Sequence, residues 1–149
     1  MSISALIDIS LQIENGAAIK ATEIVKSILA NGWTIENKGR ACYLPLDDNE
    51  MYEWIEERIG RNDLLRIVEQ KEKAKEVIGI TFYWQNTNTG LQMLAFSSTE
   101  FSFNLNINRI KIKTGNMDQL TDASWCFERI VPCFDLEYIK IGRLSFSQE

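Results

Sequence analysis

The sequence predicts an α+β domain, with one mainly antiparallel sheet that contains a three-strand meander and is flanked by three to four helices. The chain has 149 residues, a length that predicts a single domain over residues 1–149. Several segments alternate apolar and polar residues with the period of a half-buried strand, and others repeat apolar residues at helical spacing. Helices placed between strands, together with strands joined by short turns, favour a sheet partly covered by helices.

The N-terminal segment predicts a strand followed by a helix. Between Ile3 and Ile13 every second residue is apolar, and Asn15-Gly16 ends the pattern. From Ala17 to Leu29 apolar residues recur at helical spacing, and Asn31-Gly32 is a typical helix C-terminus.

The next segment predicts a hairpin and then a helix. Residues 33–36 and 42–46 form two short strands around a turn at Asn37-Lys38-Gly39. Asp47-Asp48-Asn49 can cap a helix that ends at Gly60. The apolar stripe of this helix would consist of Met51, Trp54, Ile55 and Ile59.

A further helix is predicted to begin at Asn62 or Asp63 and to run through Val68. It leads into a run of mixed charge, residues 69–76, that we expect to be a solvated helix end or loop.

The second half predicts mainly strands. Residues 77–85 and 91–97 flank the turn sequence 86–90, and a third strand follows from Phe101 to Ile112. The apolar phase of this third strand reverses after Ile107, which predicts a β-bulge near Asn108-Arg109.

The C-terminal segment predicts one more helix and a last strand. Asp122 can cap a helix that Pro132 stops, and residues 136–146 alternate as a strand.

Negative charge is concentrated in one segment. Residues 47–63 hold seven acids and two bases, a net charge of −5, which equals that of the whole chain, so the remaining 14 acids and 14 bases balance. On the predicted helix Glu50, Glu53 and Glu57 would line one exposed stripe. Such a surface fits the basic groove of a nuclease or similar toxin and would speed association, although a plain solvated helix face is the alternative. The predicted partner-binding residues are Asp47, Asp48, Glu50, Tyr52, Glu53, Glu56 and Glu57.

The residue inventory argues against an enzyme. The chain has no histidine, no GxxxxGK[ST] or GxGxxG phosphate loop, and no CxxC or EF-hand spacing. We therefore expect no catalytic residue, no metal and no cofactor. The three cysteines, Cys42, Cys126 and Cys133, favour unpaired thiols, the last two buried, over a disulfide framework.

The same residue composition indicates which classes of partner and which cellular compartment to expect. The negative balance argues against nucleic-acid binding, and residues 109–113 are expected to be a solvated basic strand face. No run of 18 apolar residues or secretory signal is present, so we expect a cytoplasmic protein without membrane contact.

In its layout the chain resembles the immunity proteins of bacterial polymorphic and contact-dependent growth-inhibition toxins. The segments that carry the resemblance are Ile80-Thr81-Phe82-Tyr83-Trp84-Gln85-Asn86-Thr87 with the meander that follows, and Asp122-Ala123-Ser124-Trp125-Cys126-Phe127-Glu128-Arg129-Ile130-Val131-Pro132. The resemblance implies a small cytoplasmic protein that blocks a cognate toxin stoichiometrically. Because those proteins share no common fold, it transfers no functional residue.

Two alternatives remain open at the level of sequence. A type III-class secretion chaperone would have similar size and acidity and would work as a homodimer on an effector segment. A small-ligand-binding domain would instead hold its ligand between sheet and helices, in a cavity lined by Trp33, Trp54, Trp84 or Trp125.

Overall fold

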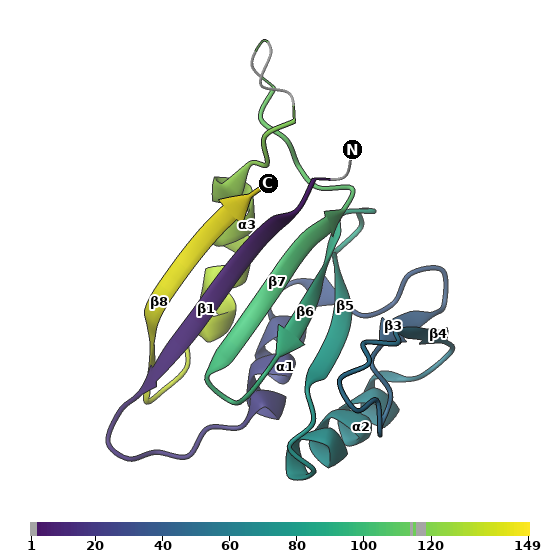
Figure 1. Ribbon diagram of the computed structural model, residues 1–149, viewed down its shortest axis with the longest axis vertical. Coiled ribbons are helices and arrows are strands. Elements are labelled where there is room, and N and C mark those ends of the chain that lie inside the picture. The colour runs from purple at the N-terminus through teal and green to yellow at the C-terminus, as the bar shows by residue number, and fades with distance from the viewer. Residues whose placement is uncertain (1–2, 114, 116–118) are drawn as a thin grey trace.

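A computed structural model describes residues 3–113, 115 and 119–149 (Figure 1). Within these ranges the chain forms a single antiparallel sheet of eight strands with three α-helices, which confirms the predicted α+β class. The elements in chain order are β1 (Ala5–Ile13), α1 (Ala21–Ala30), β2 (Trp33–Thr34), β3 (Ala41–Tyr43), β4 (Ile55–Glu57), α2 (Arg61–Lys73), β5 (Ile78–Trp84), β6 (Gly90–Ala95), β7 (Glu100–Ile107), α3 (Ala123–Ile130), a 3-10 turn (Val131–Phe134) and β8 (Ile139–Gln148).

The sheet order is β4-β3-β5-β6-β7-β1-β8, and β2 pairs with β5. The predicted meander is confirmed as β5-β6-β7, and β1 inserts between β7 and β8. In Figure 1, α1 and α3 lie behind the sheet, on the face that carries its buried apolar side chains. The other face of β1 and β7 carries polar residues such as Asp8, Ser10, Ser102 and Asn106. The alternation in the sequence therefore separates a buried face from a solvated one.

Three helices begin or end close to the predicted positions. Helix α1 starts at Ala21, four residues after Ala17, and α2 continues to Lys73. Asp122 caps α3 as predicted, because its carboxylate accepts a hydrogen bond from the Trp125 N–H at 3.2 Å. None of the helices in the described ranges is long and apolar enough to cross a membrane.

The predicted helix over residues 47–59 is wrong. These residues form an irregular loop followed by β4. Asp48 accepts hydrogen bonds from the backbone N–H groups of Tyr52 and Glu53, at 2.9 and 3.0 Å, and such local bonds compete with helix formation. Residues 55–57 then find backbone partners in β3. Positive φ angles at Asp47, Asn49, Glu50 and Tyr52 confirm that the loop departs from helical geometry.

The predicted hairpin over residues 33–46 is correct only at its turn. Asn37 and Arg40 exchange backbone hydrogen bonds of 2.9 and 3.1 Å. However, β2 and β3 both pair antiparallel with β5, so they follow one another along the same edge instead of pairing with each other.

The predicted bulge near Asn108-Arg109 is also wrong. Strand β7 ends at Ile107, and the chain leaves the sheet at Asn108, whose φ is +44°. Two hydrogen bonds connect Asn108 to the β5–β6 turn. The side-chain amide of Asn108 donates to the Asn88 carbonyl, and the Thr89 hydroxyl donates to the Asn108 backbone carbonyl. Register shifts lie elsewhere, in the β6–β7 pair and in the β1–β8 pair.

Candidate partner-binding site

The acidic residues predicted to bind a partner lie on the loop between β3 and β4 and on β4 itself. We call residues 46–53 the acidic loop. The structure does not place the acids on one helical stripe. Strand β4 separates Glu56 from Glu57, since successive side chains of a strand point to opposite faces of the sheet.

Two of the predicted acids have structural partners. Asp48 is only 9% exposed, and both its carboxylate oxygens accept backbone hydrogen bonds within the acidic loop. Glu57 accepts a hydrogen bond from the hydroxyl of buried Tyr43. Burial, and then the Glu57 carboxylate, raise the pKa of this tyrosine above its ordinary value, so it donates as a neutral hydroxyl. These two carboxylates therefore hold the segment together.

The other predicted acids face solvent. Asp47, Glu50, Glu53 and Glu56 are exposed, and among the described residues their carboxylates have no hydrogen-bond or ion-pair partner. Four carboxylates are thus available to a cation on a partner.

Apolar side chains lie exposed among these acids. Met51 is 66% exposed and Tyr52 is 42% exposed, and Leu46 is also exposed at the start of the loop. The helical spacing places Met51 on the apolar stripe of the predicted helix, and this prediction is wrong. No pattern in the sequence indicates that Met51 is exposed, because its exposure depends on these residues forming a loop and not the predicted helix.

A buried lysine anchors the acidic loop to the end of α2. Lys71 is 1% exposed, and its ammonium donates to the Pro45 carbonyl at 2.6 Å and to Glu76 Oε1 at 3.2 Å. The same Glu76 oxygen accepts the N–H of Asp47 at 2.9 Å. The sequence predicts that residues 69–76 are a solvated helix end or loop. The structure departs from this prediction at Lys71 and Glu76, because these two side chains hold the backbone of the acidic loop in place.

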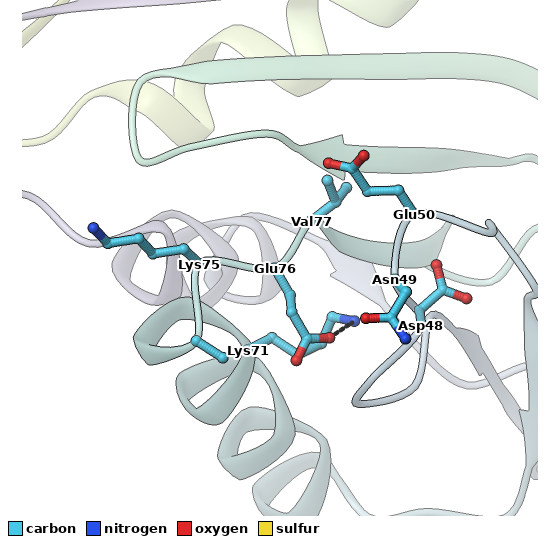
Figure 2. A pocket seen from close by; sticks show the side chains of 8 residues that line it. Asp48, Asn49, Glu50, Lys71, Lys75, Glu76 and Val77 are labelled. Atoms are coloured by element: carbon cyan, nitrogen blue, oxygen red, sulfur yellow. Dashed lines mark hydrogen bonds and ion pairs between the residues drawn. The ribbon is translucent and has the colours of Figure 1, made fainter.

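Next to this anchor lies a cavity of about 360 Å³, which we call the charged cavity (Figure 2). Figure 2 shows the side chains of Glu50, Glu76 and Lys71 around it, with the Lys75 ammonium pointing away from the carboxylates. A second cavity, of about 360 Å³, shares Lys75 and Glu76 with the first and has more apolar walls, and we call it the apolar cavity.

The tryptophans do not line these cavities. Trp33, Trp84 and Trp125 pack edge to face with ring centroids 5.2 and 6.3 Å apart, and Arg129 stacks 4.1 Å from the Trp125 ring centre. Trp54 packs over Gly79. Within the described part of the chain, the walls of these two cavities contain no tryptophan.

The remaining candidate groups have structural roles. Cys126 and Cys133 are buried as expected, and burial raises the pKa of their thiols to about 11 and about 12. Arg109 donates to the Thr121 hydroxyl at 3.1 Å, on a segment that has left the sheet, so residues 109–113 are not a strand face. Over residues 3–113, 115 and 119–149, no group of three potential metal ligands is close enough to hold an ion.

Neither models of protein families, nor curated proteins, nor solved structures give a match.

Proposed function

We propose that this protein is a cytoplasmic immunity protein, which binds a basic protein toxin and blocks it without catalysis. The observation that carries the proposal is the acidic loop, where exposed Met51 and Tyr52 stand among unpaired carboxylates. Exposed apolar side chains within a charged surface are typical of protein interfaces.

The geometry of the loop supports binding because the loop is held in place before any partner arrives. Asp48 fixes it from within, and Glu76 and Lys71 fix it to α2. A pre-ordered loop loses little conformational entropy on binding, which favours affinity. The three free carboxylates of the loop, together with Glu56 on β4, would attract a basic groove over a distance and accelerate association at low salt.

A pull-down with the full chain, from the cells that produce it, tests the proposal. We expect it to recover a basic protein encoded by the neighbouring gene, and we expect co-expression to remove that protein's toxicity. Recovery of a homodimer alone, or of an unfolded effector segment, would instead support the secretion chaperone.

Charge reversal then tests the surface. Glu57 binds Tyr43 and is therefore left intact, and the test variant is Glu50→Lys/Glu53→Lys/Glu56→Lys. The matched control is Glu23→Lys/Glu69→Lys/Glu137→Lys, whose three acids are exposed elsewhere. Each replacement adds two charges, so both variants move the net charge from −5 to +1.

We expect the test variant to weaken toxin binding by about 100-fold or more, mostly through a slower association rate at low salt, since close charge pairs each contribute strongly. The control should change binding by less than about fivefold. Equal losses in the two variants would show that only net charge matters and would reject the acidic loop as the binding surface.

A further inference from the structure

We propose that the charged cavity receives an arginine side chain of the protein partner, and that the apolar cavity beside it receives an apolar side chain from the same partner. This goes beyond a general acidic attraction but rests on the proposed function, since it names the chemistry by which that partner would be anchored.

The hydrogen bonds already made in the charged cavity decide which charge it can accept. Asp48 is occupied by two backbone N–H groups, and Lys71 is occupied by Pro45 and Glu76. The Glu50 carboxylate and the second Glu76 oxygen have no partner among the described residues. In Figure 2, Lys75 extends away from them. The acceptors that remain free favour a cation.

The walls of the charged cavity favour arginine among cations. Ala74 and Val77 supply apolar surface for a methylene stem, while the exposed Glu50 carboxylate supplies two acceptor oxygens for a planar guanidinium. Guanidinium is more weakly hydrated than ammonium, so it enters a partly enclosed site at lower cost, and arginine is enriched among the residues that dominate interface energies.

The apolar cavity lies on the other side of the wall formed by Lys75 and Glu76. Its apolar lining includes Ile19, Ile78 and Phe96, and the last of these is 50% exposed. The cavity therefore offers an independent apolar anchor next to the charged one. An arginine and a large apolar side chain on one partner surface would fill both cavities together.

The first test uses N-acetyl-arginine amide as the probe and the ¹⁵N-labelled full chain in an NMR titration. We expect a dissociation constant on the order of 10 mM, as for other ligands of this size, with shifts at the amides that line the charged cavity. N-acetyl-citrulline amide is the matched comparison, because it has nearly the same shape but no charge. We expect its affinity to be lower by about tenfold.

Two variants locate the probe in the charged cavity. Ala74→Leu fills the cavity, and Glu50→Gln removes a charge at its mouth, so each should weaken arginine binding several-fold. Glu69→Gln, which removes an exposed acid of α2 outside the cavity, should leave it unchanged. Equal binding of citrulline, or binding that Ala74→Leu and Glu50→Gln do not weaken, would overturn the inference.

The second test uses the neighbouring-gene protein and separates this inference from the proposed function. We expect Ala74→Leu and Phe96→Ala to weaken its binding, in addition to the effect of charge reversal. If charge reversal abolishes binding while these two variants bind normally, the cavity inference fails and the proposed function stands. If arginine amide binds as described but the neighbouring-gene protein neither binds the full chain nor loses its toxicity on co-expression, the proposed function fails instead.

Discussion

At the scale of single residues, composition reveals where acids are concentrated but not which of them are free. The sequence predicts that all seven residues of the candidate site lie on one surface. The structure assigns Asp48 and Glu57 to internal hydrogen bonds and shows no partner for the carboxylates of Asp47, Glu50, Glu53 and Glu56 among the described residues. This division depends on where Tyr43 and the backbone of Tyr52 lie, which is a tertiary property. No local pattern in the sequence encodes it.

The buried thiols predict an alkaline loss of stability. Burial raises the pKa of Cys126 and Cys133 to about 11 and about 12 in the folded state, from an ordinary value of 9.0. The unfolded chain therefore releases these protons first as the pH rises, so stability is complete below about pH 8 and declines above about pH 9. Urea unfolding at pH 8 and pH 10.5 measures the decline.

The variant Cys126→Ala/Cys133→Ala isolates this effect. We expect its loss between the two pH values to be smaller than that of the parent protein by about 2–4 kcal/mol, because two ionisations that favour unfolding are removed. Cys42→Ala is the control and should keep the steep decline, since both buried thiols remain. An equal decline in all three proteins would contradict the assignment.

At the scale of elements, long alternating segments were predictable and short strands were not. In strand β1 and in the meander, enough apolar residues recur at every second position to predict a strand from the sequence. Strand β4 has three residues and owes its conformation to pairing with β3. The apolar residues at positions 51, 54, 55 and 59 match helical spacing by coincidence, and tertiary pairing overrides that local pattern.

Helix α1 depends on a cap that comes from another element. Lys20, at its N-cap, makes no side-chain hydrogen bond, and Glu72 of α2 instead accepts the N–H groups of Ala21 and Thr22 at 2.6 and 3.1 Å. It also accepts the Thr22 hydroxyl at 2.7 Å. A carboxylate at a helix N-terminus satisfies free N–H groups and interacts favourably with the helix dipole.

We therefore predict that Glu72→Ala lowers the free energy of unfolding by about 1–2 kcal/mol, the usual contribution of a cap. Amide exchange should accelerate at the start of α1. Glu69→Ala, which removes an exposed acid of the same helix, should change stability by less than about 0.5 kcal/mol. The cap would have no energetic role if the two variants were equally stable.

At the scale of the whole molecule, we expect the charge distribution to lower the stability of the isolated protein. Asp47, Glu50, Glu53 and Glu56 lie close together in the chain and repel one another, with no cation of the described residues paired to them. Fold formation does not require this arrangement, because none of these four side chains belongs to the apolar core. A surface that costs stability is expected where binding, and not folding, determines the residues.

The last prediction follows from that cost. Glu50→Lys/Glu53→Lys/Glu56→Lys should raise the free energy of unfolding at low salt by about 0.5–1 kcal/mol, because it places three cations between the acids at positions 47, 48 and 57. Urea unfolding in low and high salt measures the gain, which should shrink at high salt as screening weakens the repulsion in the parent protein. The control Glu23→Lys/Glu69→Lys/Glu137→Lys makes the same net change but leaves the acids of residues 47–56 in place, so it should gain less. A loss of stability in the loop variant would mean that these carboxylates serve the fold, and it would remove the physical reason for assigning them to a partner.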